Sequence, residues 1–109
     1  WYEGDKDFTR VDWTPGTVFA PPDMMFHQHF NGAAIPSRYL AIACGGLRYP
    51  LMEEKRRIFM GMDVDVNKGG AQLEYENQDP RIHQIFLGAM EKAGAESLMG
   101  NFIDETQYR

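Results

Sequence analysis

Two histidines, His27 and His29, are separated by a single residue in the sequence Met-Met-Phe-His-Gln-His-Phe-Asn, residues 24 to 31. If this segment is extended, side chains alternate between its two faces, so both imidazoles point the same way with Cα atoms about 7 Å apart. Two imidazoles on one face can bind a single ion, and imidazole ligands suit copper, zinc, iron and nickel. The spacing therefore indicates a paired-histidine metal site. The alternative interpretation is that both histidines are ordinary core or surface residues of an aromatic strand.

The segment around this pair resembles the second conserved motif of the cupin superfamily. That motif reads glycine, five residues, proline, one residue, glycine, two residues, histidine, three residues, asparagine. Gly16, Pro22, His27 and Asn31 match it in register, and Met24 stands where the family has glycine. The resemblance implies a jelly-roll barrel with His27 as a metal ligand on its inner wall and Asn31 in a structural role. His29 is a candidate ligand because strand geometry points it the same way as His27. The general motif does not require a histidine at that position.

The first cupin motif, with its own His-x-His and a glutamate, is absent from the sequence. The chain is therefore interpreted either as the C-terminal part of a longer cupin or as a minimal cupin with a different ligand set. His83 is the only other histidine and the candidate third imidazole, with a half-exposed helix histidine as the alternative. Other residues that could replace it as a ligand are the carboxylates Glu74, Glu76 and Asp79 and the phenols Tyr49 and Tyr75.

Three imidazoles without a carboxylate favour copper or zinc over ions that prefer oxygen. The pattern is similar to that of the small copper-dependent cupins that cleave cellulose oxidatively. This similarity implies a copper-dependent oxidoreductase that acts on a polysaccharide such as cellulose, with no catalytic residue beyond the metal ligands. Aromatic residues that could stack on sugar rings, or else lie in the core or a dimer interface, are Trp1, Tyr2, Trp13 and Tyr49. Two alternatives remain: an iron or manganese cupin dioxygenase or isomerase for a small molecule, and a non-enzymatic sugar-binding cupin.

The elements that would position these residues are mostly strands. Alternating or apolar runs bounded by proline and glycine predict strands at residues 8–13, 17–20, 24–31 and 37–44. Asp79-Pro80 predicts the start of a helix that ends near Gly94. The helix would pack on the sheet through Ile82, Ile85, Phe86, Ala89 and Ala93. The predicted fold is all-β, a small cupin or jelly-roll barrel with one C-terminal helix, forming a single domain over residues 1–109.

Composition narrows the possible partners. Sixteen acidic residues outnumber 11 Lys and Arg, giving a net charge of −5, which disfavours binding to nucleic acid. The sequence has no apolar run near the roughly 20 residues of a membrane span. The uncovered edges of a small barrel predict a homodimer. Localisation stays open, and the chain would be secreted or extracellular if its substrate is a polysaccharide.

Overall fold

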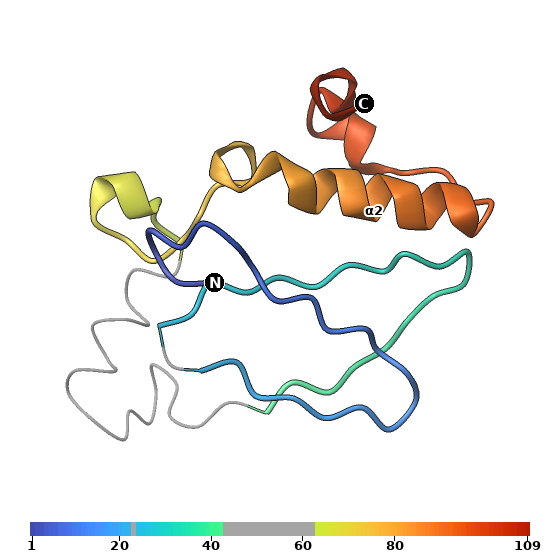
Figure 1. Ribbon diagram of the computed structural model, residues 1–109, viewed down its shortest axis with the longest axis horizontal. Coiled ribbons are helices and arrows are strands. Elements are labelled where there is room, and N and C mark those ends of the chain that lie inside the picture. The colour runs from blue at the N-terminus through green and yellow to red at the C-terminus, as the bar shows by residue number, and fades with distance from the viewer. Residues whose placement is uncertain (23, 43–62) are drawn as a thin grey trace. The chain divides into compact units, whose positions relative to one another are not determined.

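The computed structural model describes residues 1–22, 24–42 and 63–109 (Figure 1). The chain divides into two compact units, Trp1–Phe30 and Asn31–Arg109. We refer to them as the N-terminal unit and the C-terminal unit.

The described part of the N-terminal unit consists of irregular backbone closed by turns. Trp1 and Phe26 exchange two backbone hydrogen bonds, of 3.1 Å from the Trp1 nitrogen and 2.8 Å from the Phe26 N–H. At residues 14–17 the Thr17 N–H donates to the Thr14 carbonyl at 2.9 Å. Gly16 has a φ of +87° in this turn, a conformation that glycine adopts without steric cost. The chain therefore turns at Pro15 and Gly16, the proline and glycine that bound the first two predicted strands.

The predicted all-β barrel is wrong. Within residues 1–22, 24–42 and 63–109 there is no strand, and the β-type pairing is limited to an isolated bridge between Asp65 and Gln72. A strand requires a partner for its N–H and C=O groups and a buried face for its apolar side chains. The predicted strands lack the buried face, since Val18 is 93% exposed and Leu40 85% exposed. Residues 43 and 44 of the last predicted strand lie outside the described residues. The sequence patterns that predicted strands are therefore not accompanied by burial of one face of those segments.

The described elements of the C-terminal unit are one α-helix and four short 3-10 helices. The α-helix is α2 (Pro80–Lys92), and the 3-10 helices are η1 (Val66–Lys68), η2 (Tyr75–Asn77), η3 (Met99–Asn101) and η4 (Glu105–Tyr108). Asp79 caps α2, because its carboxylate accepts a hydrogen bond from the Arg81 N–H at 2.9 Å, and Pro80 occupies the first turn. Gly94, with a φ of +64°, follows the end of the helix. The predicted C-terminal helix is therefore present.

The core of the C-terminal unit lies along one side of α2. Ile82, His83 and Phe86 are buried on the helix, and Tyr108 of η4 is buried with its ring against that of His83. Figure 1 shows η4, at the C-terminal end of the chain, beside α2. The prediction that α2 packs on a sheet is wrong, because the described residues form no sheet and the 3-10 helix η4 contacts α2 instead. Ile85, predicted to be on that face, is 38% exposed. The helix therefore has a narrower buried face than its apolar pattern indicated.

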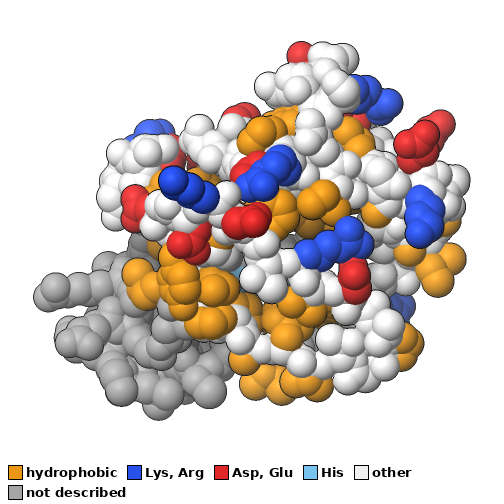
Figure 2. All heavy atoms as spheres, viewed as in Figure 1, with side chains coloured by type: hydrophobic (Ala, Val, Ile, Leu, Met, Phe, Trp, Pro, Cys, Tyr) orange, Lys and Arg blue, Asp and Glu red, His pale blue; other side chains and the backbone are white. Residues whose placement is uncertain are grey.

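Large apolar side chains are exposed in both units, among them Val18 and Phe19 in the first and Leu40, Ile42 and Phe102 in the second. Figure 2 shows hydrophobic side chains, in orange, on the face in view. The expected homodimer was argued from uncovered sheet edges, and the described residues form no sheet that would have such edges. Dimerisation stays a prediction. No helix in the described part of the chain is long and apolar enough to cross a membrane.

Candidate functional site

The imidazole rings of His27 and His29 lie next to each other in the N-terminal unit. Their centroids are 5.6 Å apart and their planes are inclined by 71°. The segment that carries them is not helical, and both side chains are exposed. With metal–nitrogen bonds of about 2 Å, two imidazoles on one ion have ring centroids no more than about 6.4 Å apart. The observed separation is compatible with a shared ion.

The hydrogen bond of His27 fixes which of its nitrogens is available. Its Nδ1 atom lies 3.1 Å from the backbone carbonyl oxygen of Met25. A carbonyl can only accept, so Nδ1 carries the proton and Nε2 of the neutral ring keeps its lone pair. Metal-binding histidines commonly donate their other ring N–H to a backbone carbonyl, which orients the ring. His27 is therefore oriented to bind a metal through Nε2.

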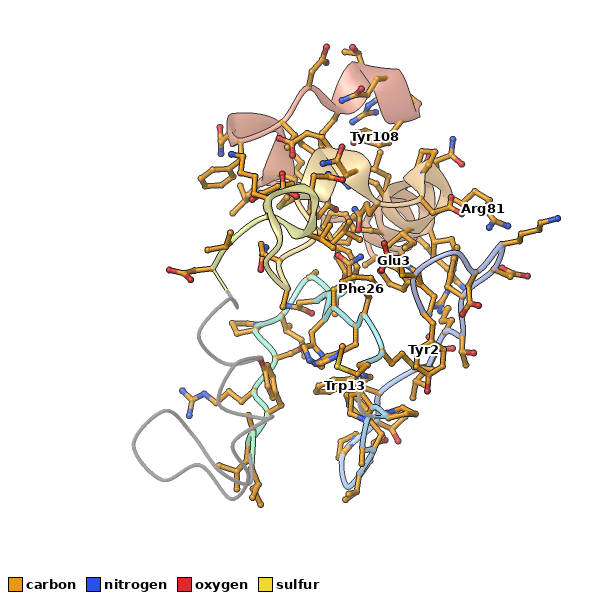
Figure 3. The ribbon with its side chains drawn as sticks, turned by 90° about the vertical axis from the view of Figure 1, so that its left-hand side faces the viewer. Tyr2, Glu3, Trp13, Phe26, Arg81 and Tyr108 are labelled. Atoms are coloured by element: carbon orange, nitrogen blue, oxygen red, sulfur yellow. The ribbon has the colours of Figure 1, made fainter. Side chains whose placement is uncertain are left out.

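Two aromatic residues surround His29. The Trp13 ring, labelled in Figure 3, lies edge to face with the His29 imidazole at a centroid distance of 5.2 Å, and the Phe19 ring lies 5.6 Å away. Trp13 and Phe19 also contact each other, with centroids 5.0 Å apart. Partial burial lowers the pKa of His29, and a positive charge on His27 lowers it further. These surroundings favour the neutral imidazole, the form that binds metal.

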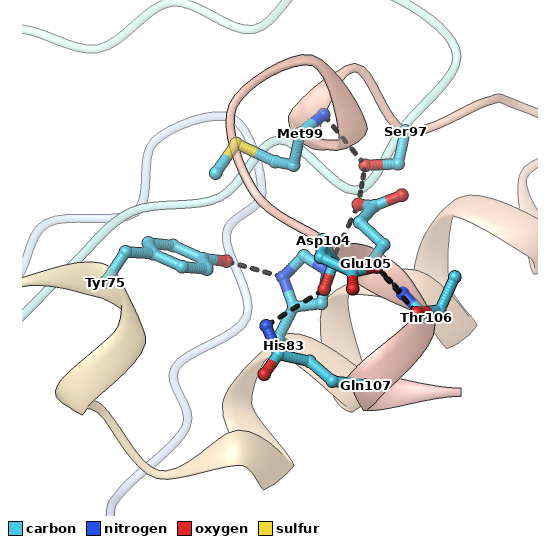
Figure 4. A network of polar contacts seen from close by, with 8 residues as sticks. All are labelled: Tyr75, His83, Ser97, Met99, Asp104, Glu105, Thr106 and Gln107. Carbon is cyan, nitrogen blue, oxygen red and sulfur yellow. Dashed lines mark hydrogen bonds and ion pairs between the residues drawn. The ribbon is translucent and has the colours of Figure 1, made fainter.

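The C-terminal unit contains a separate polar network around His83 (Figure 4). His83 has no exposed surface. Its Nδ1 lies 2.6 Å from the Tyr75 hydroxyl and its Nε2 lies 3.1 Å from a carboxylate oxygen of Glu105. Ser97 donates a hydrogen bond of 2.5 Å to the same oxygen and accepts one from the Met99 N–H at 3.1 Å. The network therefore links η2, α2 and η4 through their side chains.

His83 was proposed as a third metal ligand, and the structure gives it other partners. Both of its ring nitrogens are engaged within the C-terminal unit, by Tyr75 and Glu105. The alternative expectation of a half-exposed histidine is also wrong, since His83 is fully buried. Across residues 1–22, 24–42 and 63–109, no group of three or more His, Cys, Asp and Glu side chains is placed to hold a metal ion.

The alternative third ligands bind other residues of the C-terminal unit, are exposed in it, or lie outside the described residues. Tyr75 binds His83, and the Asp79 carboxylate binds Arg81 through a contact of 2.6 Å. Glu74 and Glu76 are exposed on and beside η2. Tyr49 lies outside the described residues. The described residues therefore offer His27 and His29 as the candidate ligand pair.

The proposed sugar-stacking residues have different surroundings. Trp13 is 40% exposed beside His29, which places a flat apolar ring next to the candidate metal site. Trp1 packs against Phe26 at 6.0 Å, and Tyr2 is exposed. Tyr49 lies outside the residues that the structure describes. Among the described sugar-stacking candidates, Trp13 is the one whose ring contacts a histidine of the pair.

Comparison with protein-family models, curated proteins and solved structures gave no match. The cupin resemblance therefore rests on the four matching positions in residues 16 to 31. One of these, Asn31, has a structural role, because its side chain binds Ile35, Ala33 and Ser37. Met24, where the motif has glycine, adopts a φ of +65°, a conformation rare in other residues and common in glycine. The backbone at this position thus has the conformation for which glycine is suited.

Sequence reasoning missed the network around His83. Glu105 is 22 residues from His83 and Tyr75 is eight residues away on the other side, a spacing that matches no familiar ligand or catalytic pattern. One signal was present: His83 lies between Ile82 and Phe86 on the buried side of the helix. A buried polar side chain needs hydrogen-bond partners. The sequence did not indicate which residues those partners are.

Proposed function

We propose that His27 and His29 form a binding site for a transition-metal ion, with copper as the preferred metal. The observation that carries the proposal is the adjacent placement of the two rings, 5.6 Å apart. The hydrogen bond from His27 to Met25 leaves Nε2 available, and the lowered pKa of His29 favours its neutral form. Both features support metal binding at neutral pH.

Copper is preferred on general chemical grounds. Among divalent first-row metals, Cu²⁺ binds most tightly to a given set of nitrogen ligands. Bound copper supplies one-electron redox chemistry. The chain contributes two imidazoles, their orientation through the Met25 carbonyl, and the partly apolar surroundings of Trp13 and Phe19. Iron, manganese and zinc are alternative metals.

Electron paramagnetic resonance of the copper-loaded protein tests this proposal. Couplings from two imidazole nitrogens are expected in the wild-type protein. They should vanish when both His27 and His29 are replaced by alanine. The matched control is Gln28→Ala, which changes the residue between the histidines and should leave the spectrum unaltered. An unchanged nitrogen-coupled signal in the double variant would disprove the site.

A second candidate function is oxidative cleavage of a polysaccharide at the copper site. The position of Trp13 favours it, since an exposed indole ring beside a metal ligand offers a surface on which a sugar ring can stack. Copper-loaded protein would be incubated with cellulose, a reductant, and dioxygen or peroxide as the oxidant, and oxidised sugars measured. Trp13→Ala should reduce their yield, with Trp1→Ala as the control. Absence of oxidised products would remove this function and leave the metal-binding proposal standing.

A further inference from the structure

The hydrogen bonds around His83 have a defined direction. A carboxylate can only accept, so Glu105 as a carboxylate receives hydrogen bonds from Ser97 at 2.5 Å and from His83 Nε2 at 3.1 Å. In the neutral tautomer of His83 that fits this bond, the ring proton is on Nε2 and Nδ1 has the lone pair. The Tyr75 hydroxyl therefore donates to Nδ1, over 2.6 Å. Tyr75, His83 and Glu105 form a continuous chain of donors and acceptors.

The surroundings of the hydrogen-bond chain from Tyr75 through His83 to Glu105 keep the Tyr75 phenol protonated. They also place one base, the His83 imidazole, next to it. His83 is fully buried, and the Glu105 side chain is 11% exposed. Burial raises the pKa of Tyr75, a side-chain hydrogen bond with Gln78 partly opposes this, and the nearby Tyr108 and Glu105 add to the rise. A neutral phenol is hard to oxidise unless its proton leaves with the electron, because the phenol radical cation is a very strong acid. Nδ1 of His83 is in direct hydrogen-bond contact and can take that proton.

From this geometry we propose that Tyr75 is a redox-active tyrosine whose proton is accepted by His83. A one-electron oxidant, such as a high-potential metal complex, removes one electron from the phenol. The O–H bond of Tyr75 breaks as the proton moves to Nδ1, which leaves a neutral phenoxyl radical. The Nε2 proton of the resulting imidazolium then moves to Glu105, so the ring is neutral again. Reduction of the radical by one electron reverses both proton transfers.

Tyr108 provides a comparison within the same unit. Its ring stacks on the same imidazole, with centroids 4.5 Å apart. Both ring nitrogens of His83 are engaged by Tyr75 and Glu105, so Tyr108 cannot pass a proton to either. Oxidation of Tyr108 thus lacks the adjacent base that Tyr75 has. This inference does not depend on metal binding at His27 and His29.

Laser-flash oxidation of the full chain tests the proposal. Tris(bipyridine)ruthenium(III), generated by a flash with a cobalt(III) quencher, serves as the oxidant. Formation of a tyrosyl radical is followed by its absorption and identified by electron paramagnetic resonance. The fast-forming radical should be lost in Tyr75→Phe and retained in Tyr108→Phe. In Glu105→Gln, where the amide can accept the Nε2 hydrogen bond but cannot take the proton, its formation should slow about tenfold or more.

A deuterium-oxide experiment on the unaltered protein supplies a readout that does not depend on any variant folding. Formation of the radical should be slower in deuterium oxide, because a proton moves with the electron. Circular dichroism confirms that each variant is folded before its kinetics are compared. Equal radical yield and rate in Tyr75→Phe would overturn the assignment to Tyr75. Equal rates in the two solvents would overturn the proton transfer to His83, and an equal rate in Glu105→Gln would overturn the part proposed for Glu105.

Discussion

The rings of His27 and His29 lie edge to face with 5.6 Å between their centroids. At this separation a positive charge on His27 disfavours a proton on His29 and so lowers the pKa of His29, in addition to the larger effect of burial. A metal ion that binds neutral imidazoles benefits from this arrangement, because fewer protons have to be displaced.

Replacing His27 by asparagine should raise the pKa of His29. The charge of His27 is one of two causes of the lowered value, after burial. The substitution removes this charge and leaves the burial by Trp13 and Phe19, so recovery of the ordinary value should be partial. Nuclear magnetic resonance titration of the His29 ring measures it. Phe30→Leu, a change in the same segment that keeps both histidines, is the control. An unchanged His29 pKa in His27→Asn would contradict the electrostatic coupling.

The lowered pKa of His29 also predicts the sign of a pH effect on stability. The unfolded chain binds a proton at the ordinary pKa of about 6.5, while the folded chain binds it only at lower pH. The free energy of unfolding should therefore fall as pH decreases from about 6.5 to the folded pKa, and this contribution should disappear in His29→Asn. Urea denaturation at a series of pH values measures the difference between the two proteins. If the difference in the free energy of unfolding between the two proteins does not vary over this pH range, the lowered pKa of His29 is contradicted.

Copper should quench the fluorescence of Trp13 more than that of Trp1. The Trp13 ring lies 5.2 Å from the His29 ring, so an ion bound to that imidazole is close to the indole. The protein has two tryptophans, which allows each to be removed in turn. Copper-dependent quenching should be largely lost in Trp13→Phe and retained in Trp1→Phe. The opposite pattern would place the copper away from His29.

Removing the carboxylate of Glu105 should destabilise the C-terminal unit. Glu105→Ala leaves the buried His83 N–H and the Ser97 hydroxyl without their acceptor, at a cost of about 1–3 kcal/mol. Glu105→Gln should cost less, because its amide oxygen can still accept. Glu96→Ala, at an exposed position, is the control and should change stability by no more than about 0.5 kcal/mol. Urea denaturation measures all three, and equal effects of Glu105→Ala and Glu96→Ala would contradict the network.

Glycine at position 24 should be tolerated or stabilising. Met24 has a φ of +65° and a 70% exposed side chain, so the substitution relieves backbone strain and removes little buried surface. A left-handed conformation costs a non-glycine residue about 1–2 kcal/mol, partly offset by the greater flexibility of glycine in the unfolded chain. We expect a change between zero and about 1 kcal/mol of stabilisation. Met25→Gly, at a partly buried neighbour, should destabilise, and thermal denaturation compares the two. Destabilisation by Met24→Gly equal to that by Met25→Gly would contradict this prediction.

The sequence allowed the local features to be predicted and not the barrel. Asp79-Pro80 determines where α2 begins, because capping and the fixed φ of proline act within one turn of the helix. The turn at Gly16 is likewise local. A barrel depends on pairing between distant segments, and a mostly apolar run such as residues 37–42 shows no preference for a particular partner. Their side chains are exposed in the structure, and the predicted sheet is absent from the described residues.

The candidate site, too, was predicted only where it depends on residues close together in the sequence. A spacing of two residues in a non-helical segment was enough to bring His27 and His29 together, although the segment is not a strand. The environment of His83 depends on Glu105, 22 residues further along the chain, which folds onto the helix through η4. Such a contact is set by tertiary packing, so helix position alone could not assign a role to His83.

The most direct test of metal binding by the histidine pair uses the imidazole signals of the three histidines in nuclear magnetic resonance. The protein would be titrated with zinc, a diamagnetic ion that imidazole also binds. The signals of His27 and His29 should shift together at one equivalent, while that of His83, held by Tyr75 and Glu105, should stay in place. A shift confined to His83, or no saturable shift of His27 and His29, would contradict the proposed metal site.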